Sequence, residues 1–124
     1  MNSNIRAVTY DGLVERYKEM YLEIKKQNNM KTFKELSWET YPGGGEMARE
    51  HFDNGYGASV VRHAFSYGGK IGLYELAVIN NKGEICYTTP ITNDVVGYLS
   101  ESDVSDIMIM IQELPTVDTT NNTK

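Results

Sequence analysis

The sequence has one cysteine, two histidines and no long hydrophobic run, and each shortage excludes a class of protein. A single cysteine, Cys86, rules out an internal disulfide framework and any zinc site built from several cysteines. No apolar stretch approaches the roughly 18 residues that a membrane-spanning helix needs. The N-terminal segment lacks the apolar core of a secretory signal, so we expect a cytoplasmic protein with no membrane partner.

What the chain does contain is typical of a globular domain. Its 124 residues are 40% hydrophobic, 23% charged and 10% aromatic, which favours a folded protein over a disordered one. A chain of this length forms one good core rather than two. We therefore predict a single domain over residues 1–114, followed by a disordered tail over 115–124 in which Val117 is the only apolar residue.

The formal net charge of −5 is distributed unevenly. Residues 1–45 carry seven basic and six acidic side chains, whereas residues 46–124 carry five basic and eleven acidic ones. This balance argues against direct nucleic-acid binding through phosphate neutralisation. Three C-terminal carboxylates are instead candidates for contact with a basic partner protein, although a solvated helix face is the simpler alternative. They are Glu101, Asp103 and Asp106.

Three N-terminal segments are predicted to be helical. Over 11–27 the apolar residues recur at offsets of 0, 4, 7, 8 and 11, the spacing of one stripe along a helix. A capping box at Thr32–Glu35 predicts a short helix through Glu39. Residues 46–52 fit two further helical turns, which Asn54-Gly55 would end.

The periodicity then becomes that of strands. Residues 58–65 and 72–79 have strand patterns, and 84–88 follows a strong turn at 80–83, so we predict a three-stranded antiparallel meander. Both sides of the 72–79 strand are largely apolar, which indicates a central strand. A short β-prone segment, 95–99, is a candidate fourth strand.

Ser100 is a good N-cap for a C-terminal helix that runs to about Leu114. The apolar residues of this segment recur at offsets of 0, 3, 4, 7 and 10 from Val104, so one face of the helix should pack on the sheet. N-terminal helices, an antiparallel meander and a helix packed on it together make an α+β fold.

Few residues point to catalysis. His51 and His63 lie twelve positions apart without a metalloprotease spacing, so a metal site would also need a nearby carboxylate. Cys86 could pair with His63 only if their strands were neighbours. The glycines at 43–45 precede a predicted helix, as in phosphate-binding loops, but the lysine and hydroxyl residues of such loops do not follow. We expect no cofactor and no bound metal.

The unusual feature of the composition is nine tyrosines in a small domain. Tyrosine buries a large area at low entropic cost and keeps a hydroxyl, so protein interfaces favour it. Tyr17, Tyr21 and Tyr74 are expected in the interior. The tyrosines expected in loops are candidates for partner binding, and these are Tyr41, Tyr56 and Tyr67.

Three segments of the chain resemble small proteins of tailed bacteriophages. They are NGYGASVVR at 54–62, GLYELAV at 72–78 and YTTPITNDVVGYL at 87–99. The resemblance covers about residues 54–114 and implies no catalytic residues. It implies a setting, the cytoplasm of a host bacterium, in which small acidic phage proteins often bind and disable a host or defence protein.

We therefore expect a phage accessory protein that binds and modulates or inhibits a host or bacterial-immunity protein, such as a nucleic-acid-handling enzyme with a basic surface. Two other functions stay open. One is a small enzyme or nucleotide-binding protein that uses His51 and His63 with nearby carboxylates. The other is a phage DNA-metabolism or structural accessory protein with affinity for single strands through Arg62, Lys70 and the tyrosines. The sequence leaves the oligomeric state undetermined.

Overall fold

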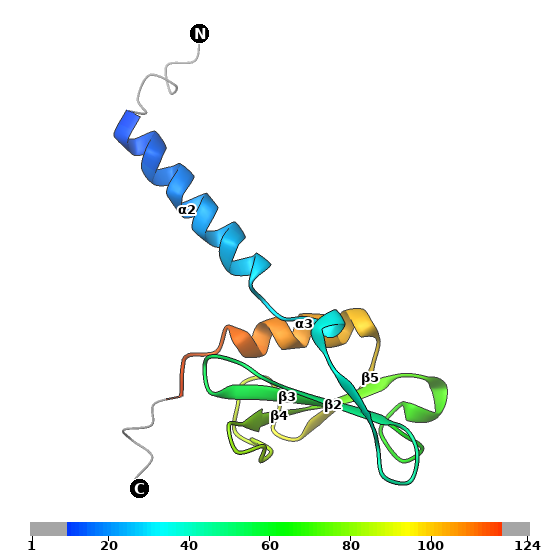
Figure 1. The fold of residues 1–124 in the computed structure, drawn as a ribbon. Helices are drawn as coiled ribbons and strands as arrows, with labels where there is room; N and C mark the ends of the chain where they lie inside the picture. The colour runs from blue at the N-terminus through cyan, green and yellow to red at the C-terminus, as the bar shows by residue number, and fades with distance from the viewer. Residues whose placement is uncertain (1–9, 118–124) are drawn as a thin grey trace, which may run out of the picture. The chain divides into compact units, whose positions relative to one another are not determined.

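The computed structural model describes residues 10–117, and the chain forms two compact units that divide between residues 30 and 31. The first unit contains helix α2, Tyr10–Asn28. The second contains a sheet and helix α3, Glu101–Gln112 (Figure 1). Neither helix described in 10–117 has both the length and the apolar character needed to cross a membrane.

The sheet has five antiparallel strands in the order β1-β2-β3-β4-β5. The strands are β1 (Trp38–Thr40), β2 (Glu46–His51), β3 (Tyr56–Arg62), β4 (Tyr74–Asn80) and β5 (Val95–Leu99). Two single 3₁₀ turns, η1 (Phe33–Glu35) and η2 (Gly69–Ile71), lie in the connections. Because neighbours in the sheet are also neighbours along the chain, the predicted antiparallel meander within an α+β fold is confirmed, but it has five strands instead of the predicted three with a candidate fourth.

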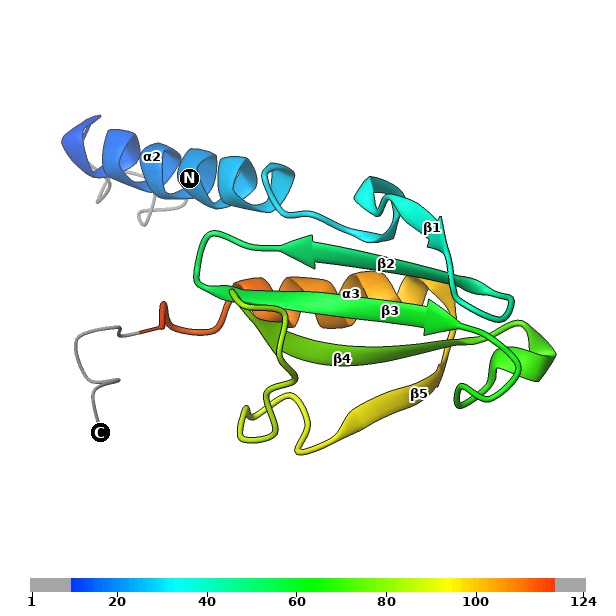
Figure 2. The same cartoon turned by 60° about the horizontal axis from the view of Figure 1, so that its bottom comes forward.

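Helix α3 covers one face of the sheet, as its apolar spacing predicts. Figure 2 looks onto the opposite face, with the strands in front of α3. Val104, Met108 and Ile111 of the helix are fully buried in one core cluster with strand residues. The strand residues of that cluster with no exposed surface are Ala58, Val60, Leu76 and Val78. Each fully buried aliphatic side chain stabilises the fold by about 2 kcal/mol, so this contact holds the unit together.

The segment 46–52, predicted to be helical, forms strand β2, and the prediction is wrong. The strand pairs along its length with β3 and with β1 on its other edge. The intrinsic helix preference of its residues contributes only about a few tenths of a kcal/mol per residue. Two ladders of hydrogen bonds and the burial of Ala48 outweigh it. Asn54-Gly55, expected to stop a helix, forms the β2–β3 hairpin turn.

Two more segments differ from prediction. The capping box at Thr32–Glu35 starts only one 3₁₀ turn, after which the chain extends into β1 instead of remaining helical to Glu39. Residues 84–88 form a single bridge, between Ile85 and Ile79, instead of a strand. The reason is that β5, the predicted short strand, pairs with the rest of the same edge of β4.

Helix α2 is confirmed, but the burial expected of its tyrosines is not. Tyr17 and Tyr21 are 70% and 54% exposed, whereas Tyr74, the third tyrosine expected inside, lies in the core. Most of the tail predicted to be disordered, residues 118–124, lies outside the described residues. Its described part is tied to the fold, because the N–H of Val117 donates to the carbonyl of Asn54 at 2.9 Å.

A buried asparagine joins the β2–β3 turn to the end of α3. Nδ2 of Asn54 donates to the carbonyl oxygens of Ile111 at 2.8 Å and Leu114 at 3.1 Å, and Oδ1 accepts the N–H of Tyr56 at 3.2 Å. The bond to Leu114 satisfies a carbonyl group just past the end of the helix, and the bond to Ile111 adds a second donor to a carbonyl that already accepts the N–H of Leu114 at 3.1 Å. Asn54 is 9% exposed, so solvent has little access to replace these bonds.

Removing this amide should destabilise the protein. We expect Asn54→Ala to lower the free energy of unfolding by about 2 kcal/mol, because three shielded hydrogen bonds of the side chain are lost. Asn54→Asp should cost more, since a carboxylate of the same shape places negative charge against the carbonyl oxygens of Ile111 and Leu114. Urea unfolding measures both variants, with the exposed Asn93→Ala as control. An aspartate variant as stable as the wild type would contradict this role.

Candidate functional site

The loop from 63 to 73, which joins β3 to β4, is held by hydrogen bonds at several points. Ser66 Oγ accepts the N–H of His63 and donates to the carbonyl of His63, both at 2.9 Å. The N–H of Tyr67 donates to a β4 carboxylate at 2.9 Å, and the carbonyl of Tyr67 accepts the N–H of Tyr98 at 3.0 Å. The loop is therefore fixed to itself, to β4 and to β5.

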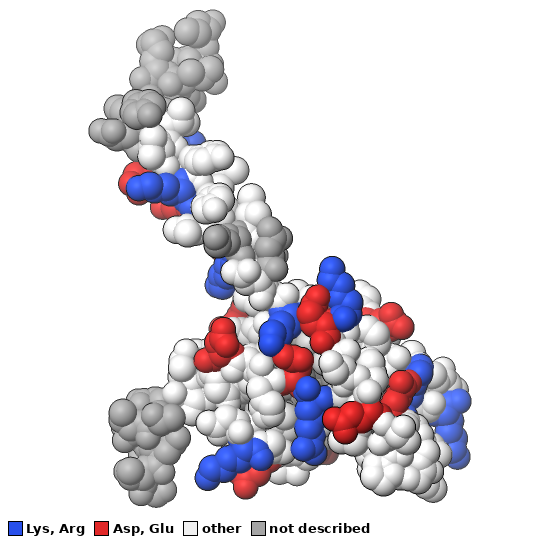
Figure 3. Space-filling view, viewed as in Figure 1, with Lys and Arg blue, Asp and Glu red and all other residues white. Residues whose placement is uncertain are grey.

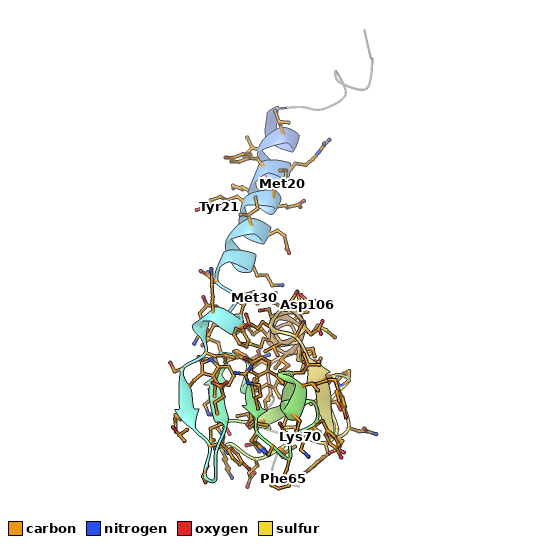
Figure 4. The ribbon with its side chains drawn as sticks, turned by 90° about the vertical axis from the view of Figure 1, so that its right-hand side faces the viewer. Met20, Tyr21, Met30, Phe65, Lys70 and Asp106 are labelled. Atoms are coloured by element: carbon orange, nitrogen blue, oxygen red, sulfur yellow. The ribbon has the colours of Figure 1, made fainter. Side chains whose placement is uncertain are left out.

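This loop and the end of β5 expose four large apolar side chains, which we call the end patch. They are Phe65, Tyr67, Ile71 and Tyr98, with exposed fractions of 92%, 57%, 71% and 61%. Phe65, Ile71 and Tyr98 line one shallow depression of about 320 Å³ together with Lys70. The rings of Tyr67 and Tyr98 are 6.5 Å apart. Phe65 and Lys70 both lie on the side of the sheet away from α3 (Figure 4).

The backbone under the end patch adopts a conformation that few residues tolerate. Tyr98 has a φ of 58°, and within residues 10–117 it is the one non-glycine residue with positive φ. The register of the β4–β5 pairing shifts at this point. The preceding Gly97 packs so closely on Tyr67 that a methyl group there would collide with Cβ of the tyrosine. Backbone strain of this kind persists where the surrounding structure enforces it, and it concentrates at functional sites.

The three tyrosines predicted to bind a partner lie in different places. Tyr67 belongs to the end patch. Tyr41, between β1 and β2, is half-buried and stacks on the ring of His63 with 4.1 Å between centroids, so it lies beside the 63–73 loop. Tyr56 begins β3, at the other end of that strand, and packs against the core. The structure therefore does not place Tyr56 with the other two.

Sequence reasoning missed the other three members of the end patch. The strand predicted over 58–65 ends at Arg62, which leaves Phe65 in the loop, and the β-prone pattern of 95–99 predicts no distinct role for Tyr98. A usable signal was present, because glycines stand beside large apolar residues at Gly68-Gly69 and at Gly97. Glycine at such positions permits close approach of two chain segments.

The predicted acidic residues lie exposed on α3, and one of them serves the helix itself. Oδ2 of Asp103 accepts the N–H of Ser100 at 3.0 Å, while Ser100 Oγ accepts the N–H of Asp103 at 3.1 Å. Hydrogen bonds from the backbone and then the side chain of Ser100 hold the pKa of Asp103 below its ordinary value. On the face shown in Figure 3, acidic and basic side chains are interspersed. Asp106 and Phe65 lie on opposite sides of the unit (Figure 4).

The structure does not bring the two histidines together. His51 ends β2 and His63 follows β3, so the antiparallel register places them at opposite ends of one hairpin, about 20 Å apart at 3.4 Å per residue. Cys86 lies beside Val78, away from His63, and burial raises the pKa of its thiol, which disfavours a nucleophile. Within residues 10–117 no three potential ligands form a metal-binding group.

His63 does line a broad depression of about 610 Å³, together with Glu39 and Glu46. Two of the groups an enzyme would use there are engaged with other residues, whereas Glu39 is exposed. Glu46 forms an ion pair with Arg62, and Nδ1 of His63 accepts the N–H of Phe65 at 3.2 Å. The depression can hold a small polar ligand, but the carboxylate of Glu46 and the imidazole of His63 contribute to the structure of the hairpin ends.

The glycine segment at 43–45 forms the turn between β1 and β2 and does not precede a helix. The carbonyl of Gly45 accepts the N–H of Tyr41 at 3.0 Å, and the N–H of Gly44 donates to the carbonyl of Tyr41 at 2.9 Å. Because the strand β2 follows instead of the predicted helix, the helix start that a phosphate-binding loop needs does not exist here.

Arg62, considered for single-strand binding, is engaged inside the second unit. Besides its ion pair with Glu46, its guanidinium lies 4.7 Å from the ring centroid of Tyr74, and it donates to the carbonyl of Gly72 at 3.4 Å. Lys70 is exposed. Among the residues described, Lys70 is the exposed cation that lines the end patch, and one cation is too little positive charge for binding that depends on phosphate contacts.

No family model, no curated protein and no solved structure matches this chain. The resemblance to phage proteins therefore stays a prediction, and function must be argued from the surfaces themselves.

Substitutions at Tyr98 should separate backbone strain from side-chain contacts. Asparagine tolerates positive φ, whereas a β-branched residue does not. We expect Tyr98→Asn to keep the free energy of unfolding within about 1 kcal/mol of the wild type, and Tyr98→Val to lower it by about 2 kcal/mol. Urea unfolding compares the two. Equal stability of both variants would show that residue 98 is not held at positive φ.

The pH dependence of stability should depend on Asp103. Because its pKa is lowered in the folded protein, its stabilising effect is present above the pKa of the unfolded chain, about 3.9, and disappears as the pH falls through the folded value. Asp103→Asn should therefore lose less stability than the wild type on acidification from about pH 6 to about pH 3. Urea unfolding at both pH values measures this. In a carboxyl NMR titration, Ser100→Ala should raise the pKa of Asp103, because the serine hydroxyl is lost while the N–H of residue 100 remains, and an unchanged pKa would refute the contribution of the hydroxyl.

Proposed function

We propose that this protein is a non-enzymatic accessory protein that binds another protein, with the end patch as its main contact surface. One observation carries the proposal: four large apolar side chains, each more than half exposed, stand together on a loop and a strand end that hydrogen bonds hold in place. Single exposed apolar residues are ordinary, whereas a contiguous group marks an interaction site. Fixing the group in advance reduces the entropy lost on binding.

The partner we propose is a host or bacterial-immunity protein, and the phage resemblance is what supports that setting. A nucleic-acid-handling enzyme is a suitable target, because its basic surface would attract the carboxylates exposed on α3, Glu101 and Asp106. The acidic helix and the end patch lie on different sides of the unit. We therefore assign the helix to the rate of encounter and the end patch to the lifetime of the complex.

Two alternatives have less support. An enzyme that uses both histidines is disfavoured because His51 and His63 lie at opposite ends of a hairpin. Binding of single-stranded nucleic acid is disfavoured because the guanidinium of Arg62 is engaged with Glu46 and Tyr74.

The proposal is tested by affinity purification of the tagged protein from bacterial lysate, infected and uninfected, followed by a binding assay with the recovered partner. Phe65→Ser and Ile71→Ser should each weaken binding at least tenfold, because large apolar residues at the centre of an interface are worth about 1.4 kcal/mol or more. Both residues are so exposed that stability should change by no more than about 0.5 kcal/mol.

The matched control is Tyr87→Ser, since Tyr87 is also large and 54% exposed but lies outside the end patch. It should bind as the wild type does. Asp106→Lys should slow association and leave dissociation unchanged, and it spares the Ser100–Asp103 cap. If Phe65→Ser and Ile71→Ser bind the partner as tightly as the wild type does, the end patch is not the contact surface. Turnover of a nucleotide that is lost in His63→Ala, with no partner recovered, would favour the enzyme instead.

A further inference from the structure

A second apolar surface, in the first unit, is separate from the end patch. Helix α2 exposes four apolar side chains in one row, which we call the α2 stripe. They are Leu13, Tyr17, Met20 and Ile24, with exposed fractions of 57%, 70%, 61% and 56%. Figure 4 shows Met20 extending from the helix. A helix with so much apolar surface in one row is typical of one that packs against another helix.

The spacing of the α2 stripe indicates what kind of helix would cover it. The steps between its members are four, three and four residues, which is the alternation of a heptad seam. A seam of this kind interlocks with a second seam of the same spacing, in which each side chain fits between four others. A helix that carries such a seam is therefore complementary to a copy of itself.

The side chains flanking the α2 stripe determine the orientation of the two copies. On one flank stand Arg16 and Glu23, which immediately precede Tyr17 and Ile24. In an antiparallel pair this flank faces the same flank of the second copy, and in a parallel pair it faces the other flank. Antiparallel pairing with Leu13 opposite the second Ile24 places each Arg16 near the Glu23 of the other copy.

We propose that α2 mediates homodimerisation by packing antiparallel against α2 of a second copy. The two-fold axis passes between Tyr17 and Met20. Tyr17 of each copy therefore contacts Met20 of the other copy. Two symmetry-related Arg16–Glu23 pairs flank the seam. Glu23 also has interactions within its own chain, and its two carboxylate oxygens can accept a further donor.

The ion pairs and the apolar seam contribute different amounts of free energy to the dimer, and so they have different roles. An exposed ion pair contributes only about 0.5 kcal/mol, so the charges determine orientation while the apolar seam supplies the affinity. Helix α2 has 19 residues, about 28 Å at 1.5 Å per residue, which is less than three heptads. A seam this short predicts a weak dimer that dissociates on dilution. Dimerisation would place two end patches in one particle, which raises the avidity for a partner with repeated sites.

Sedimentation equilibrium of the full chain over a wide concentration range tests the dimer. The mass should rise with concentration from 14.0 kDa towards twice that value. Met20→Glu should weaken association at least tenfold, because it places a charge at the centre of the seam. Leu22→Glu is the matched control, since Leu22 is 62% exposed on the opposite face of α2 and should not affect association. Circular dichroism at high concentration verifies that α2 stays helical in the control.

Charge exchange tests the orientation. Arg16→Glu should weaken association several-fold by placing two carboxylates together, and Arg16→Glu combined with Glu23→Arg should restore it. Rescue by the double variant supports the antiparallel pair. A chain that remains monomeric at every concentration, equal effects of Met20→Glu and Leu22→Glu, or failure of the double variant to restore association would each overturn the proposal. Since none of these measurements involves the end patch, they stand or fall independently of the proposed function.

Discussion

The packing of α3 on one face of the sheet is the interaction on which the rest of the second unit depends. Val104, Met108 and Ile111 lose all exposure there, and polar side chains of the same helix hold the incoming chain. Ser105 Oγ accepts the N–H of Phe33 at 3.0 Å, and the Gln112 amide exchanges two hydrogen bonds with the backbone of Lys31. Without α3, the sheet would lose its core and the segment before β1 its attachment.

That packing also explains how the end patch can exist. A loop that exposes Phe65 and Ile71 gains little from its own burial, so its shape must come from the frame around it. The buried hydroxyl of Ser66 and the pairing of Tyr67 with Tyr98 supply this frame, and they require β3, β4 and β5 to be in register. The positive φ of Tyr98 is tolerated for the same reason. The stable core thus holds the strands in place, and the strands hold the exposed apolar side chains of the end patch in one arrangement.

Local patterns predicted those elements whose own periodicity agrees with their place in the fold. This holds for α3, with its N-cap at Ser100, and for β4, apolar on both sides. It fails for 46–52, where helix-favouring residues form an interior strand because hydrogen bonding on two edges exceeds a weak intrinsic preference. It fails again at 84–88, because competition for one edge of β4 involves β5, a segment further along the chain.

By itself, the sequence determined which side of each helix is apolar, where α3 begins and where the turn before Glu84 lies, because these depend on residues close together in the chain. Only the tertiary structure decided which apolar surfaces are covered. It buried the face of α3, left the stripe of α2 exposed, and joined Tyr98 to the 63–73 loop. Burial and the meeting of distant residues depend on strand register and on contacts between separate segments, which local periodicity does not record.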